Sequence, residues 1–256
     1  MSKIHNAFAK GKAFIPYLTA GDPDAQTTVA LILAMAEAGA DLIEIGIPFS
    51  DPMAEGPVIQ EANIRALNAK TTTETVFSIV EEVRKQSQIP LIFLTYLNPV
   101  LSYGKDRFFA RCQALGVDGI LVPDLPFEER DELLEETKRY GVDLIYMVAP
   151  TSDDRIAHIA KEATGFLYVV SSLGVTGVRS EITTDVGSMV KKIRAVSDVP
   201  MAIGFGISTP KQAQDMAKVS DGAIVGSAIV RMIGEKGKDA IADVASYVCT
   251  MKDAIR

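Results

Sequence analysis

Short apolar runs recur along the chain, and each is followed by a polar and apolar segment with helical spacing. Runs that stay apolar over consecutive positions are typical of strands buried on both faces of a parallel sheet. The pattern predicts eight such strands, at 13–19, 41–47, 90–96, 118–124, 143–149, 165–171, 200–206 and 221–227.

The segments between these runs predict helices, and glycines mark several of their ends. Gly39, Gly116 and Gly141 each lie between a helix-like segment and a strand, where a positive φ is needed to end the helix. Alternating strands and helices favour a single (β/α)8-barrel domain over residues 1–256, with a short extra helix at the N-terminus. A doubly wound open sheet is the alternative. The helical segments include 24–38, 74–87, 105–115, 127–140, 152–163, 184–197 and 209–218.

Composition limits the classes of function. Hydrophobic residues make up 48% of the chain, and the net charge of −7 makes a nucleic-acid partner a poor expectation. Cys112 and Cys249 are expected to be buried, inert thiols in a reducing compartment, and two distant histidines do not suggest a metal site. The N-terminus lacks the apolar stretch of a signal peptide, and no apolar run approaches the roughly 20 residues that span a bilayer. We therefore expect a cytoplasmic protein.

Acidic side chains gather around the second predicted strand. Glu44 lies among apolar neighbours, and strand alternation puts it on the same face as Leu42, so it can point into a barrel mouth. A carboxyl group in an apolar pocket makes a general acid near neutral pH, although a buried Glu satisfied by hydrogen bonds remains an alternative. Asp51 and Glu55 follow in a proline-rich loop, where Asp51 can also be a plain turn residue. Three acids fit proton transfer, and they also fit a divalent metal.

Glycine-rich turns follow the last three predicted strands, as GVTG at 174–177, GFG at 204–206 and GS at 226–227. Glycines let backbone N–H groups approach an anion, and Ser227 opens the last helical segment, where the helix dipole favours negative charge. Barrels often bind phosphate after strands 7 and 8. We predict a phosphate site there; simple tight turns are the alternative.

The segment EIGIPFSDPMAEGP at 44–57 resembles the signature of the tryptophan synthase alpha subunit family. The resemblance extends in order and spacing across FIPYLTAGDP, LTYLNP, VPDLPFEE, YVVSSLGVTGVR, GFGIS and GSAIV. It implies a carbon–carbon lyase that splits indole-3-glycerol phosphate by a retro-aldol reaction. It also implies that Glu44 is the catalytic acid/base and that the second acid falls on Glu55, where the family usually has Asp. The phosphate would be held by Gly177, Gly206, Gly226 and Ser227.

An apolar slot for the indole ring is expected from strand-end residues, although ordinary core packing is the better explanation for any one of them taken alone. The loop at 173–185, which includes Arg179, is expected to be a mobile cover over the site. The substrate-binding expectation covers Tyr17, Leu94, Tyr96, Leu121, Tyr168, Thr176 and Phe205.

The resemblance also implies a partner. A beta subunit that carries pyridoxal phosphate would bind in an α2β2 complex near Pro48, Asp51 and Asn98 in the 98–104 loop, and this chain would need no cofactor or metal of its own. Three alternatives remain open: a stand-alone indole-releasing lyase, another phosphate-binding barrel such as an isomerase or prenyl-transfer enzyme, and a non-catalytic activating subunit.

Overall fold

Eight parallel strands close into one barrel. The computed structural model describes residues 3–150, 155–171, 186–204 and 206–256. Each strand pairs with the next along the chain, and the first pairs with the last, so the sheet has no open edge. This closure confirms the (β/α)8 prediction over the open sheet. The strands are β1 (Ala13–Thr19), β2 (Ile43–Gly46), β3 (Leu91–Leu94), β4 (Gly119–Leu121), β5 (Asp143–Val148), β6 (Leu167–Val170), β7 (Met201–Gly204) and β8 (Gly222–Val225).

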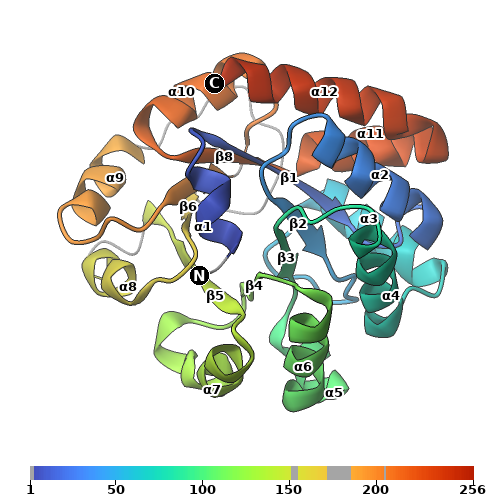
Figure 1. Cartoon of the computed structure of the whole chain (residues 1–256), viewed down its shortest axis with the longest axis horizontal. Helices are drawn as coiled ribbons and strands as arrows, with labels where there is room; N and C mark the ends of the chain where they lie inside the picture. Colours follow the sequence, from blue (N-terminus) through green and yellow to red (C-terminus); the bar gives the residue numbers. More distant parts are fainter. Residues whose placement is uncertain (1–2, 151–154, 172–185, 205) are drawn as a thin grey trace.

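Helices form a ring outside the barrel, while α1 lies across its centre in the view of Figure 1. The extra helix that the sequence predicts at the N-terminus is therefore present. The α-helices are α1 (Lys3–Phe8), α2 (Ala25–Glu37), α3 (Pro57–Asn68), α4 (Thr73–Arg84), α5 (Leu97–Tyr103), α6 (Lys105–Leu115), α7 (Asp131–Tyr140), α8 (Ile156–Glu162), α9 (Val186–Arg194), α10 (Pro210–Val219), α11 (Ser227–Lys236) and α12 (Ile241–Ala254), with 3₁₀ turns at Phe127–Glu129 and Gly237–Ala240.

Local sequence signals explain where several helices begin and end. The Asp24 carboxylate accepts a hydrogen bond from the Thr27 N–H and so caps α2. Thr209 and Gln212 form a reciprocal capping box at the start of α10. The helices α6 and α7 end at Gly116 and Gly141, both with φ of +66°, which confirms the predicted positive φ at these helix ends.

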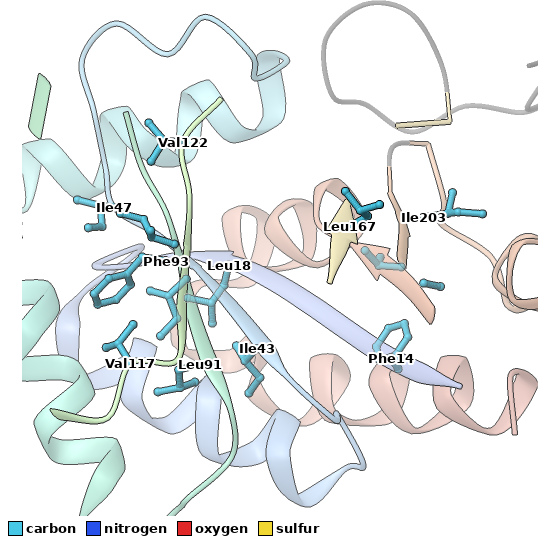
Figure 2. Close-up of a cluster of buried hydrophobic side chains, with 14 of the residues drawn as sticks. Phe14, Leu18, Ile43, Ile47, Leu91, Phe93, Val117, Val122, Leu167 and Ile203 are labelled. Carbon is cyan, nitrogen blue, oxygen red and sulfur yellow. The ribbon is translucent and has the colours of Figure 1, made fainter. Parts of the chain in front are cut away.

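The hydrophobic core has two layers, because successive strand residues point to opposite faces. Phe14 and Leu18 on β1 and Ile43 on β2 point outward and pack against the helices, as Figure 2 shows for part of this outer layer. The inner layer fills the barrel and includes Ile15 on β1 and Leu42 just before β2. Glu44 on β2 points to the same inner side as Leu42, as the alternation predicts.

The inner layer is closed at the N-terminal ends of the strands by α1. Ile4 and Ala7 of this helix are buried in the inner cluster, and the Phe8 ring lies 5.6 Å from the ring of Phe166 just before β6. One end of the barrel is therefore plugged by apolar side chains. The opposite end, at the C-terminal ends of the strands, is not covered by α1 and can hold a functional site.

Two predictions need correction. The 98–104 segment is not a loop but the helix α5, in which Pro99 falls in the first turn, where a missing N–H costs no hydrogen bond. Cys112 is buried as predicted, but Cys249 is exposed, because it lies on a face of α12 turned away from the barrel. Among the helices of the described residues, none is long and apolar enough to cross a membrane.

Candidate active site

A pocket opens at the C-terminal ends of the strands and reaches into the barrel. Its walls combine two carboxyl groups, two tyrosines, three residues of the glycine-rich turns and an apolar surface. This is the end of a (β/α)8 barrel where catalytic residues gather. The apolar surface comes from Leu94, Leu121, Pro123, Met147, Ile207 and Ile224.

The first carboxyl group belongs to Glu44 on β2. It lies beside Tyr17 of β1 in the strand register, and its side chain is 1% exposed. The Oε1 atom is buried with no hydrogen-bond partner in the described part of the chain. Burial, followed by the charge of Glu55, raises the pKa of Glu44 to about 8. Glu44 therefore carries a proton at neutral pH, unlike an ordinary glutamate.

The second carboxyl group belongs to Glu55, in the loop between β2 and α3. It is 3% exposed, and burial raises its pKa to about 7, opposed by a hydrogen bond from the Tyr96 side chain. The Tyr96 hydroxyl also accepts a hydrogen bond of 3.0 Å from the Ala54 N–H. The Tyr96 ring stacks on Phe49, with 5.2 Å between the ring centroids. The loop therefore turns inward at Glu55 because Tyr96 holds it.

The two carboxyl groups suit proton transfer near neutral pH. Their pKa values lie close to the working pH, which is the condition for efficient general acid–base catalysis. In the ranges that the structure describes, no group of three or more His, Cys, Asp or Glu side chains is placed to hold a metal ion. Asp51 lies outside the pocket: it is exposed, and its carboxylate accepts a hydrogen bond from the Ser50 hydroxyl. Of the three acids that the sequence groups together, Glu44 and Glu55 share the pocket and Asp51 does not.

Another part of the pocket has features that suit an anion. Gly206, Gly226 and Ser227 line it, and Ser227 is the first residue of α11. The free N–H groups of a helix N-terminus and the helix dipole favour negative charge there. Gly177, predicted to share this task, lies outside the described residues. The pocket therefore combines two carboxyl groups that suit proton transfer with a helix N-terminus that suits an anion.

The sequence matches the family model described as tryptophan synthase alpha chain over residues 4–256. The chain belongs to the tryptophan synthase alpha chain family. A tryptophan synthase alpha chain of Lactiplantibacillus plantarum is 50% identical over 256 residues, which cover 100% of this chain and 97% of the relative. The relative of the same name from Lacticaseibacillus casei is 49% identical over 255 residues, covering 100% and 96%.

Solved structures of the family have the same fold. Tryptophan synthase subunit alpha of Legionella pneumophila aligns with a TM-score of 0.90 and 37% identity, covering 100% of this chain and 98% of that one. A chain of the Pyrococcus furiosus tryptophan synthase a2b2 complex aligns with a TM-score of 0.88 and 40% identity, covering 95% and 99%. Family membership therefore rests on both sequence and architecture.

Most of the site residues that the sequence predicts in this family member lie in one pocket. Tyr17, Leu94, Leu121 and Tyr168 line it together with the two acids. Tyr96 is not among the lining residues, because its hydroxyl is turned to the Glu55 loop. Thr176, Phe205 and the predicted cover at 173–185 lie outside the described residues.

Sequence reasoning missed several pocket residues. Met147 and Ile224 occupy inward positions of β5 and β8, so strand alternation was a signal that could have found them. Ile59 lies on α3, a helix that the apolar pattern did not predict, and no sequence signal pointed to it. Helix α3 begins at Pro57, whose fixed φ suits the first helical position.

The residues expected at a partner interface differ in exposure. Asp51 and Asn98 are exposed at the barrel mouth, whereas Pro48 is buried and its side chain is not available at the surface of the chain. Met53 and Leu101 belong to the same two segments and are 80% and 46% exposed. Two exposed apolar side chains therefore lie in the segments where the contact is expected.

Proposed function

We propose that this chain catalyses the alpha reaction of its family, the retro-aldol cleavage of indole-3-glycerol phosphate to indole and glyceraldehyde 3-phosphate. One observation carries the proposal: two buried carboxyl groups with raised pKa values share an apolar pocket with the N-terminus of α11. An acid–base pair at one end and an anion site at the other match a small molecule that has an aromatic ring and a phosphate.

The phosphate is held by neutral groups. Backbone N–H groups at Gly226 and the start of α11, with the Ser227 hydroxyl, donate hydrogen bonds to it. No Lys or Arg lines the described part of the pocket, so the attraction comes from helix and peptide dipoles. This anchor fixes the three-carbon tail and leaves the indole ring among Leu94, Leu121 and the other apolar side chains.

Glu44 begins the reaction as an acid. Its carboxyl group donates a proton to carbon 3 of the indole ring, which becomes a positively charged indolenine. Glu55, as a carboxylate, accepts a hydrogen bond from the ring N–H and stabilises this charge. The state with Glu44 protonated and Glu55 ionised is favoured between their pKa values of about 8 and about 7.

Glu44 then completes the reaction as a base. Its carboxylate takes the proton of the 3′-hydroxyl, the C–C bond to carbon 3 breaks, and the bonding electrons return to the ring. Indole keeps the added hydrogen on carbon 3, and the tail leaves as the aldehyde. Glu44 recovers its proton, so the cycle uses no cofactor on this chain.

Indole passes to a beta subunit that carries pyridoxal phosphate. Asp51, Met53, Asn98 and Leu101 at the exposed barrel mouth support a contact there, beside the opening through which indole leaves. The Pyrococcus furiosus structure is an a2b2 complex by its own description. We propose the same assembly for this chain, with the contact on the β2–α3 loop and α5.

The test is indole release from indole-3-glycerol phosphate by the purified chain, with and without a beta subunit. We expect release in both assays, faster with the partner, and loss of release in Glu44→Gln. A folded chain that stimulates the beta subunit but releases no indole would be an activating subunit and would refute the proposal. Gel filtration of the mixture separates the partnered enzyme from a stand-alone lyase.

A further inference from the structure

Helices α3 and α11 pack against each other, and each begins at the pocket. Helix α3 starts at Pro57, two residues after Glu55, and α11 starts at Ser227. Both Glu55 and Ser227 line the pocket. Ile59 of α3 and Val230 of α11 belong to one small buried cluster. The packing of α3 on α11 therefore decides how far the second acid lies from the anion site.

The backbone of Glu55 is tied to α3. The side-chain amide of Gln60, one turn into this helix, donates a hydrogen bond of 2.8 Å to the Glu55 carbonyl oxygen. The Gln60 N–H donates to the Gly56 carbonyl oxygen at 3.0 Å. Because these two bonds close the step from the loop into the helix, a shift of α3 carries the Glu55 backbone with it.

Arg65 joins α3 to the loop that follows β1. Its guanidinium donates two hydrogen bonds of 2.8 Å to the Asp22 carboxylate, one from Nε and one from Nη2. A bidentate pair of this kind fixes orientation as well as distance. Asp22 is 2% exposed, and the loop that carries it is anchored, because the Gly21 N–H donates to the Thr28 hydroxyl of α2 at 3.0 Å. The Asp22 carboxylate is thus a firm point of attachment for α3.

The same guanidinium lies against α11. A Cβ atom on Gly234 of this helix would lie 2.8 Å from Nη2 of Arg65, so the glycine leaves the room that the Arg65 side chain occupies. One side chain of α3 therefore contacts both neighbours of the helix, the β1–α2 loop and α11.

We propose that Arg65 is a positioning residue: by fixing α3 against α11, it sets the distance between Glu55 and the phosphate site at Ser227. This inference deepens the proposed function and rests on it. A ligand that engages both places at once gains from each only when their spacing matches its own length. Ligands that engage one place alone do not depend on that spacing.

Two conservative variants loosen the pair. Arg65→Lys keeps the positive charge and loses the fork of donors, and Asp22→Asn keeps the shape and replaces one acceptor oxygen by a donor. Arg84→Lys is the matched control. Arg84 also joins a helix to another segment, because its Nη2 donates to the Gly116 carbonyl oxygen at 2.7 Å, but this bond lies just before β4, at the end of the barrel away from the pocket.

The closing experiment titrates the full-length chain with three ligands, followed by NMR so that weak binding is measured as well. The ligands are indolepropanol phosphate, which is the substrate without its two hydroxyls, indole, and inorganic phosphate. In Arg65→Lys and Asp22→Asn we expect indolepropanol phosphate to bind about 10-fold more weakly, while indole and phosphate change by less than about twofold. Arg84→Lys should leave all three affinities unchanged.

A purely structural role for the pair gives a different result. If the melting temperature falls in Arg65→Lys while all three affinities stay intact, or if all three ligands weaken equally, the proposal is overturned. Asp22→Asn decides the question alone if Arg65→Lys does not fold. A selective loss in Arg84→Lys as large as that in Arg65→Lys would also refute a role specific to α3 and α11.

Kinetics separates this inference from the proposed function. If the starting protein binds indolepropanol phosphate but releases no indole from the substrate, the proposed function fails, whereas the titrations still decide the role of Arg65. If the starting protein binds none of the three ligands, both proposals fail. In an active enzyme, kcat/KM should fall by about 10-fold or more in both variants, because the Glu55 carboxylate must also meet the ring of the bound substrate.

Discussion

The Tyr96 hydroxyl holds the Glu55 loop at two points: it hydrogen-bonds the Glu55 side chain and accepts the N–H of the preceding residue, Ala54. Tyr96 is the N-cap residue of α5, and the next N–H, that of Leu97, donates to Asp124 at 2.9 Å. The position of the second acid is thus fixed by side chains that follow β3 and β4.

The longer side chain at position 55 should therefore be required in this chain. Glu55→Asp, which restores the residue usual in the family, withdraws the carboxylate by one C–C bond from Tyr96. Because misplacement of about 1 Å can cost on the order of 10²-fold, we expect kcat to fall by about 10- to 100-fold. Steady-state kinetics of Glu55→Asp and Tyr96→Phe measure this. Equal or higher kcat in Glu55→Asp would show that the loop adjusts.

Removing the Glu44 acid should stop the chemistry but not the binding. Glu44→Gln keeps the shape and the burial while it loses the proton that is transferred. We expect kcat to fall by about 10²- to 10⁴-fold, the usual contribution of general acid–base catalysis. Binding of a non-cleavable substrate analogue, measured by calorimetry, should change little. Near-normal kcat in the folded variant would remove Glu44 from the mechanism.

Activity should depend on pH as a narrow bell. The competent state needs Glu55 ionised, which is lost below its pKa of about 7, and Glu44 protonated, which is lost above its pKa of about 8. The profile of kcat/KM from pH 5 to 10 should therefore peak between these values. A profile that stays flat above pH 9 would contradict the acid role of Glu44.

The buried Glu44 should also make stability depend on pH. Its pKa is raised from about 4.5 to about 8 on folding, so the folded state binds more protons, and the free energy of unfolding falls as pH rises through this window. At pH 9, Glu44→Gln should be more stable than the starting protein by about 5 kcal/mol, and at pH 4 the difference should vanish. Urea unfolding at both pH values measures it. An equal difference at pH 4 and pH 9 would point to packing instead.

Ser227 should act on substrate affinity alone. Ser227 is the first residue of α11 and lines the pocket. Its proposed role is to bind the phosphate, whereas the two acids transfer protons. Ser227→Ala loses one hydrogen bond to a charged group, which contributes about 1.5 to 3 kcal/mol, so KM should rise by about 10- to 100-fold with kcat nearly unchanged. Inorganic phosphate, as a competitive inhibitor, should weaken in parallel. A fall in kcat with unchanged KM would place Ser227 at the reacting atoms.

The sequence alone determined the eight strands and most of the helices between them, several helix ends and the face of β2 that carries Glu44. These features depend on neighbouring residues: apolar runs, capping side chains and glycines with positive φ act over a few positions. The family motif around Glu44 and Glu55 is likewise contiguous, so it was readable without coordinates.

Only the tertiary structure decided which side chains share a site. Tyr96 looked like a lining residue, yet it points to Ala54 and Glu55, which lie more than 40 positions earlier in the chain. The Tyr17 hydroxyl meets Gly46 only because the barrel closes in one register. Contacts, burial and the pKa shifts that follow from them depend on packing between distant segments, and the local pattern of a sequence does not contain that packing.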